Sequence, residues 1–263
     1  MSPIFATNGG LSGVKRTTTV LDAPGMWTLE EQAIAKRAGI WPAIGPGGGP
    51  MPTLWYDFAD ESTVTVASSQ ITAVTSKGTR AWTLTKSSTG PGYVTGINSL
   101  KSLDWGSSQH SNYLRSTDST TTAIGEVYAV VDGAFGGSFS TYAGLMSGTG
   151  GSSWYFLGFS GAWTAAGTNF NQVFINGSAT NRVSSDPFSS PSIDSPAIIR
   201  VNNSTSATFN ATDGFQIGND RTNGDRGWFG LVGEYIVYSS VLSSDQRTLV
   251  MNYLATKWNV TLV

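Results

Sequence analysis

Short apolar segments separated by turn dipeptides recur along most of the chain, and this pattern constrains the fold more than any other feature of the sequence. The dipeptides contain Gly or Asn, which tolerate the positive φ that tight turns require. Many short strands at near-regular spacing are typical of an all-β sandwich or jelly roll. We expect strands at residues 64–66, 71–74, 81–84, 127–131, 142–146, 155–159, 173–175, 197–201, 215–217 and 231–238.

The strongest turn signal is the pair Asn176 and Gly177, which follows the expected strand 173–175. Asn-Gly favours a two-residue hairpin turn in which both central residues have positive φ. A hairpin is therefore predicted at this point. A second pairing is expected between the neighbouring strands 64–66 and 71–74.

One helix is predicted near the C-terminus. Ser243 is suited to the N-cap, and Gln246 three residues later completes a capping box. Asp245 in the first turn and Lys257 in the last both complement the helix dipole. Helical periodicity gives an apolar face that should lie against a sheet or an end of the sandwich. This face consists of Leu249, Val250, Tyr253, Leu254 and Trp258.

The first fifty residues differ from this body. A short helix is predicted at 29–38, with Thr28 as its N-cap and Glu31 in a capping box. A helix of this length is below the ~12–15 residues at which isolated helices become marginal in water, so it needs a surface to pack on. The Gly/Pro-rich segment 45–50 is interpreted as a linker, with a long surface loop as the alternative. We therefore expect an N-terminal arm at 1–50 and one β-sandwich at 51–263.

The charge content excludes several classes of protein. Charged residues make up 12% of the chain and the net charge is −2, so the sequence has no basic footprint for nucleic acid. No apolar run approaches the ~20 residues that span a bilayer, so membrane insertion is not expected. The chain has no Cys and one His, His110, which excludes thiolate metal sites and any site that needs two imidazoles within one chain. His110 lies in a polar stretch and is interpreted as a solvated loop histidine.

The end of the chain resembles a known family. Residues 215–218 (FQIG), 228–238 (WFGLVGEYIVY) and the helix end at 253–258 (YLATKW), together with the opening 54–60 (LWYDFAD), are similar to the laminin-G-like, concanavalin A-like jelly rolls. The resemblance implies an antiparallel β-sandwich jelly roll with a short C-terminal helix, preceded here by the arm and its one short helix.

The arm carries a second resemblance. Residues 25–42 (GMWTLEEQAIAKRAGIWP) are similar to a short segment of tailed-phage virion proteins that precedes variable, often lectin-like domains. This implies a non-enzymatic structural protein on the virion surface, either a capsid decoration or fibre or a tail-associated subunit. Its arm would bind other virion proteins, and the role implies a homo-oligomer. The alternative is that the arm helix folds back onto its own sandwich. The candidate attachment residues are Trp27, Leu29, Ile34, Ile40 and Trp41.

Exposed aromatic side chains suggest host glycans as a second partner, because aromatic rings stack on sugar faces. The candidates are Trp154, Trp163 and Trp228, each with a core position as the alternative. A free carbohydrate-binding module or lectin, without a virion role, is the competing interpretation of the whole chain.

Glycan hydrolysis is the enzymatic alternative, and it needs two carboxyl groups roughly 5–10 Å apart. No pair of acidic residues two apart lies within one expected strand, although carboxyls of separate strands can converge. Glu234 stands in an apolar strand without a carboxyl at 232 or 236. We interpret it as a structural hydrogen-bonding group for a loop or turn backbone, with a ligand contact as the alternative.

No cofactor is expected, and a bound calcium ion is the one metal hypothesis. Calcium takes oxygen ligands, and a Gly-rich region supplies acidic and amide side chains without the EF-hand spacing. Asp and Asn are also ordinary turn residues. The residues concerned are Asp213, Asn219, Asp220, Asn223 and Asp225.

Overall fold

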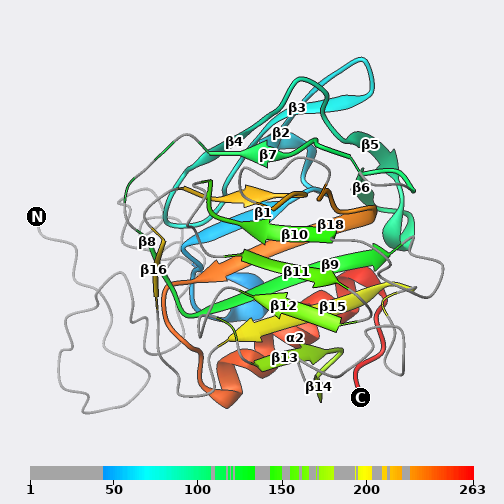
Figure 1. Ribbon diagram of the computed structural model, residues 1–263. Helices are drawn as coiled ribbons and strands as arrows, with labels where there is room; N and C mark the ends of the chain where they lie inside the picture. The colour runs from blue at the N-terminus through cyan, green and yellow to red at the C-terminus, as the bar shows by residue number, and fades with distance from the viewer. Residues whose placement is uncertain are drawn as a thin grey trace, which may run out of the picture.

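A computed structural model of the chain describes residues 44–107, 110–116, 118, 120, 122–133, 143–149, 155–159, 162–165, 170, 172–180, 193, 195–202, 209–211, 214–220 and 226–263. Within them the chain is mostly antiparallel β-sheet with one C-terminal α-helix (Figure 1), which confirms the all-β fold class. The helical elements are η1 (Pro46–Gly48), η2 (Glu61–Thr63), η3 (Ile97–Ser99) and α2 (Ser244–Trp258). The strands are β1 (Leu54–Asp57), β2 (Val64–Ala67), β3 (Gln70–Thr75), β4 (Thr83–Lys86), β5 (Gly92–Thr95), β6 (Lys101–Asp104), β7 (Leu114–Arg115), β8 (Thr122–Ile124), β9 (Glu126–Gly133), β10 (Ala143–Ser147), β11 (Tyr155–Phe159), β12 (Ala162–Ala165), β13 (Gln172–Ile175), β14 (Ser178–Thr180), β15 (Ala197–Asn202), β16 (Phe209–Ala211), β17 (Gln216–Ile217) and β18 (Gly230–Tyr238).

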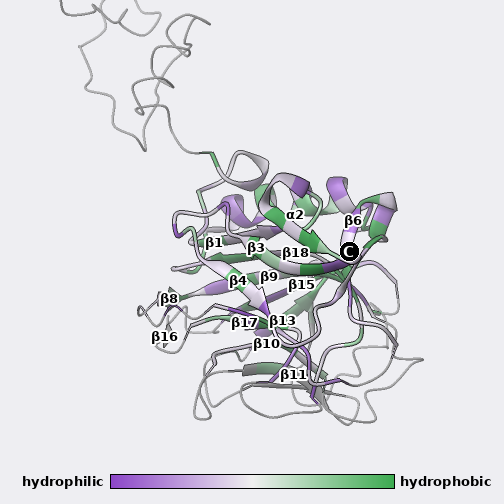
Figure 2. Ribbon diagram, turned by 90° about the horizontal axis from the view of Figure 1, so that it is seen from above, coloured by the Kyte–Doolittle hydropathy of each residue, from purple (hydrophilic) through white to green (hydrophobic). Residues whose placement is uncertain are grey.

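Hydrogen bonds join most strands in one path with the order β12-β11-β10-β17-β7-β4-β3-β5-β6-β18-β9-β15-β13-β14. β1 pairs with β18 and β2 with β3, while β8 and β16 form a separate pair. Figure 2 shows the layers: α2 lies on one side of β9, β15 and β18, and β10, β11 and β17 lie on the other. The strands β9, β15 and β18 are therefore covered on both faces.

The burial pattern of β9 shows the consequence of this double cover. Val127, Ala129 and Val131 belong to the apolar core between the two halves of the sheet, whereas Tyr128 and Val130 belong to the cluster beneath α2. Successive side chains of a strand point to opposite faces. A strand buried on both faces reads as a continuous apolar run, as this one does.

A β-bulge in β18 decides which residues face the helix. The register with β9 shifts between Val232 and Glu234, so Gly233 is the extra residue. A Cβ atom at Gly233 would lie 2.7 Å from the ring of Trp258, which leaves room there for glycine alone. The bulge places Glu234 on the same side as Ile236, toward α2.

Each of the ten expected strands overlaps an observed one, although β4 begins at Thr83 and extends to Lys86 where a strand was expected at 81–84. The Asn176–Gly177 hairpin is also confirmed, since these residues have φ of 53° and 94° and join β13 to β14. The expected pairing of β2 with β3 is present as well, with a turn at Ser68 and Ser69, whose φ values are 50° and 61°.

The capping box of α2 is confirmed: the Gln246 N–H donates to Ser243 Oγ, and the Ser243 N–H donates to Gln246 Oε1. The predicted apolar face is rotated by part of a turn. Leu249 is exposed, Tyr253 is half-buried, and Met251 is buried in its place. Arg247 and Lys257 contact buried carboxylates of the sheet at the two ends of the helix. These contacts help to decide which face of the helix packs on the sheet.

The Gly/Pro segment is not a free tether between arm and body. Pro46 is buried, the Gly45 N–H donates to the Gly49 carbonyl, and η1 packs on α2. A Cβ atom at Gly47 would lie 2.3 Å from the Leu249 carbonyl oxygen, so only glycine fits. The expected helix at 29–38 lies outside the described residues. Within them, no helix has both the length and the apolar content of a membrane span.

Candidate functional site

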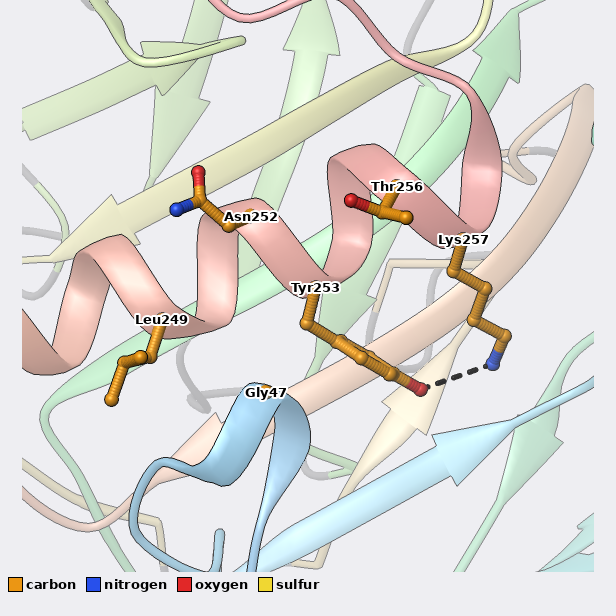
Figure 3. A pocket seen from close by; sticks show the side chains of 6 residues that line it. All are labelled: Gly47, Leu249, Asn252, Tyr253, Thr256 and Lys257. Atoms are coloured by element: carbon orange, nitrogen blue, oxygen red, sulfur yellow. Dashed lines mark hydrogen bonds between the residues drawn. The ribbon is translucent and has the colours of Figure 1, made fainter.

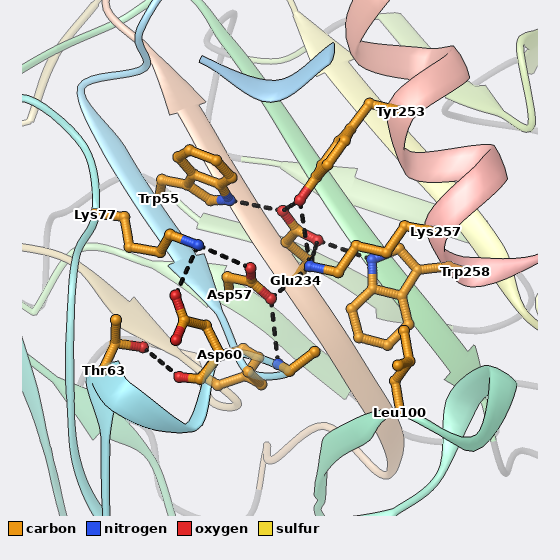
Figure 4. Close-up of polar contacts among 12 residues, drawn as sticks. Trp55, Asp57, Asp60, Thr63, Lys77, Leu100, Glu234, Tyr253, Lys257 and Trp258 are labelled. Atoms are coloured by element: carbon orange, nitrogen blue, oxygen red, sulfur yellow. Dashed lines mark hydrogen bonds and ion pairs between the residues drawn. The ribbon is translucent and has the colours of Figure 1, made fainter. Parts of the chain in front are cut away.

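Buried carboxylates contact α2 near each of its ends, and Glu234 lies near the last turn of the helix (Figure 4). Its Oε1 accepts hydrogen bonds from Trp55 Nε1 at 2.6 Å and from the Tyr253 hydroxyl at 3.1 Å. Its Oε2 accepts from Lys257 Nζ and from Trp258 Nε1, both at 2.8 Å. Each oxygen therefore already accepts two hydrogen bonds, as a buried carboxylate requires.

Asp57 extends this cluster on the neighbouring strand. The register of β1 on β18 sets Asp57 directly opposite Glu234, and Lys257 Nζ contacts both carboxylates. Lys77 Nζ lies 3.0 Å from the second Asp57 oxygen and 2.9 Å from Asp60 Oδ2. Two ammonium groups thus hold three carboxylates together.

Proton affinities follow from these contacts. Burial raises the pKa of Glu234, and the charge of Lys257 opposes that rise. Hydrogen bonds from Ser62 and Lys77 lower the pKa of Asp60 to about 2. Burial disfavours the charged form of Lys77, but its contacts with Asp60 and Asp57 outweigh this and raise its pKa.

The second buried carboxylate is Glu126, beneath the first turn of α2. Its Oε1 accepts from the Tyr128 hydroxyl at 2.7 Å and from Arg200 Nη1 at 3.1 Å, and Arg247 Nε donates to the carboxylate at 3.1 Å. The Leu242 N–H donates to Oε2 at 3.0 Å. Arg247 of the first turn and Lys257 of the last turn therefore fasten α2 to the sheet at both ends.

A surface pocket adjoins the Glu234 cluster (Figure 3). It has a volume of about 370 Å³ and lies between η1 and the outer side of α2. Tyr253 and Lys257 belong both to its wall and to the hydrogen-bonded group around Glu234. Its lining consists of Gly47, Leu249, Asn252, Tyr253, Thr256 and Lys257.

The sugar-binding prediction for Trp228 is wrong. Its side chain is fully buried in the core between the two halves of the sheet, so it presents no face to a glycan. Trp163 is placed on β12, which pairs with β11, and its side chain lies outside the described part. Trp154 and the attachment residues Trp27, Leu29, Ile34, Ile40 and Trp41 also lie outside the described residues.

The geometry around Glu234 agrees with a structural role, but its partners differ from those expected. We expected a loop or turn backbone, and the donors are four side chains from β1 and α2. Acidic pairs within one strand do not reveal the opposition of Asp57 to Glu234, because these residues belong to different strands. The signal that could have found it is the pairing of segment 54–60 with 230–238. With Lys257 in contact with both carboxylates, this pair is engaged in ion pairing.

His110 is packed, which corrects the interpretation of a solvated loop residue. Its ring stacks on Trp105 with 5.2 Å between centroids. Its Nδ1 accepts from the Asn112 N–H at 3.0 Å, so Nε2 carries the proton and donates to the Trp228 carbonyl. Burial lowers the pKa of the imidazole, which favours its neutral form.

The calcium hypothesis stays a prediction. Asn219 and Asp220 are buried, and Asp220 Oδ2 lies 2.9 Å from Arg226 Nη1. The other three residues proposed as ligands lie outside the described part of the chain. Among the residues that the structure describes, no group of three or more His, Cys, Asp or Glu side chains is arranged to hold a metal ion.

Comparison with known proteins adds no identification: the chain matches no family model, no curated protein and no solved structure.

Proposed function

We propose that the chain is a non-enzymatic structural protein of a phage virion, anchored by its N-terminal arm and displaying a β-sandwich on the particle surface. The sandwich would be of the concanavalin A-like, laminin-G-like jelly-roll type. The proposal rests on the resemblance of residues 25–42 to a virion segment and of the closing strands and helix to that domain type. The all-β fold with a C-terminal helix is compatible with it.

One structural observation supports the proposal: a preceding arm would leave the described body from the α2 side. The described chain begins at Ile44, one residue before a turn that packs on α2. β10 and β11 lie on the far side of the central strands from α2 (Figure 2). An arm bound to a particle would therefore hold the α2 side inward and turn β10 and β11 outward. This polarity is what an anchored display domain needs.

The partners follow from this arrangement. The arm would contact other capsid or tail proteins, and copies of the chain would assemble as a homo-oligomer that follows the symmetry of the particle. Host glycans are proposed for the outward side, where β12 carries Trp163. The protein would act as a capsid decoration or fibre, or as a tail-associated subunit.

The second candidate function is a free carbohydrate-binding module, and it is favoured if the arm has no particle partner. A glycan hydrolase is the third. The engaged state of the Asp57 and Glu234 carboxylates counts against that pair as its catalytic acids, because each is held by ammonium groups.

The test is incorporation into particles. The full chain, a chain lacking residues 1–43 and the chain with Trp27→Ser and Leu29→Ser are each produced during infection, and particles are purified. We expect the full chain in the particles and both variants in the soluble fraction, each as a folded protein with a cooperative unfolding transition. Equal incorporation of all three proteins would refute anchoring by the arm. Absence of the full chain from particles, with binding on a glycan array, would favour the free module.

A further inference from the structure

The pocket between η1 and α2 lies where the arm begins. Gly47 forms part of its wall, and the arm residues before Ile44 lie only a few positions earlier in the chain. A chain spans at most ~3.3–3.6 Å per residue. The residues just before Ile44 are therefore tethered within roughly 20 Å of the pocket.

The pocket is bordered by apolar surface that the described residues leave uncovered. Leu249 of α2 lines it and is 41% exposed, and Ile44 at the junction is 55% exposed. The Tyr253 ring and the stem of Lys257 complete a largely apolar wall (Figure 3). Long charged side chains commonly cover apolar neighbours with their stems while the charged group is held elsewhere, here by Glu234 and Asp57.

We propose that the indole of Trp41 from the same chain occupies this pocket, against Leu249 and Tyr253. Trp41 lies three residues before Ile44 and is the large aromatic side chain nearest to the junction on the arm side. A volume of about 370 Å³ is large enough to accommodate an indole ring. Stable contacts between separate proteins bury well over ~1,000 Å², which a single pocket does not supply.

The tether favours the chain's own arm over a second copy. A short linker gives the attached group an effective concentration of the order of millimolar, which a neighbouring molecule in dilute solution does not reach. Docking of Trp41 would fix the direction in which the arm leaves the body, with Trp27, Leu29 and Ile34 remaining for a particle partner. The inference concerns the isolated protein, so it stands or fails independently of the proposed virion role.

The test uses disulfide trapping. The chain has no Cys, so only the introduced cysteines can form a disulfide. The probe variant combines Ile40→Cys, next to Trp41, with Asn252→Cys in the pocket wall. The matched control combines Ile40→Cys with Val66→Cys, an exposed position on β2. A third variant adds Trp41→Ser to the probe pair. Oxidation of the full-length protein at low concentration is followed on non-reducing gels.

We expect the probe pair to form an intramolecular disulfide at least roughly tenfold faster than the control pair, and we expect Trp41→Ser to remove this preference; a tenfold ratio corresponds to about 1.4 kcal/mol. Equal rates for probe and control would overturn the proposal. A predominantly intermolecular disulfide would also overturn it and would assign the pocket to the arm of a second copy. Persistence of the preference after Trp41→Ser would show that another arm residue occupies the site.

Discussion

Glu126 and Glu234 are both buried carboxylates that hold α2 against the sheet, yet they are neutralised in different ways. Glu126 faces two guanidinium groups, and one of them, Arg200, is itself buried. Glu234 faces one ammonium group and two indole N–H groups, and its lysine is shared with Asp57. One end of α2 is therefore held by a carboxylate whose buried arginine has no second carboxylate as an ion-pair partner among the described residues, and the other end by a lysine that two carboxylates share.

The largest effect is expected for Glu126→Gln. The buried Arg200 guanidinium would lose its carboxylate, and breaking a buried pair by removing one partner costs about 3–5 kcal/mol. Urea denaturation of the variant should show this loss in the free energy of unfolding. Glu61→Gln, at an exposed carboxyl, is the control and should change it little. A loss below about 1 kcal/mol for Glu126→Gln would contradict this ranking and would favour Phe174, whose ring centre lies 3.5 Å from Arg200 Cζ, as the main partner of Arg200.

Glu234→Gln should cost less, about 1.5–3 kcal/mol, the range for hydrogen bonds to charged groups. Lys257 keeps Asp57 as its partner in this variant, so no buried cation is left unpaired. The same urea experiment ranks the two substitutions. If Glu234→Gln lowered the free energy of unfolding more than Glu126→Gln, the explanation by the shared Lys257 would be wrong.

Gly233→Ala should destabilise the protein by about 1 kcal/mol or slightly more, the lower part of the range for overpacked cores. The added methyl group would meet the ring of Trp258, which donates to Glu234, so only the Glu234 end of the helix should respond. Hydrogen exchange can resolve this: amides of the last turn of α2 should exchange faster and those of the first turn should not. Gly92→Ala in β5, where a Cβ has ordinary contacts, is the control; an equal effect there would remove the steric explanation.

The smallest expected effect is on the pH dependence of stability, to which His110 and Glu234 contribute with opposite signs. The folded protein holds the neutral imidazole, so the unfolded chain binds the extra proton first as the pH falls below about 6.5, and stability is lost in that window. The raised pKa of Glu234 acts in the opposite sense, since the folded form then takes up its proton first. The urea midpoint of the wild type should therefore fall more between pH 7 and pH 5 than the midpoint of His110→Gln does. Parallel pH profiles for the two proteins would contradict the packed, neutral histidine.

The elements that sequence predicted correctly depend on neighbours along the chain. The Asn176 turn and the Ser243 capping box are set within a few residues, so their signals are local. The sequence does not indicate a turn at Ser68 and Ser69, because neither residue is the usual choice for positive φ. The candidate site required long-range information: Trp55 and Glu234 are 179 positions apart, and only the pairing of β1 with β18 brings them together.

The sequence also does not predict which individual aromatic residues are buried. Trp228 and His110 both lie in polar or Gly-rich stretches that suggest exposure. Trp228 is nevertheless buried in the core, and His110 is half-buried. The partners of His110 come from two separate segments: the Trp105 ring, and the neighbouring Gly227 N–H and Trp228 carbonyl. The rotation of the apolar face of α2 has a similar origin, since the sheet carboxylates hold Arg247 and Lys257 in place.

We propose that the arm makes the α2 side of the body the anchored side. A density map of purified particles carrying the full chain tests this most directly. We predict that Ile44 and α2 face the particle body and that β10 and β11 face outward. Density that places β10 and β11 against the particle, with α2 exposed to solvent, would contradict the account.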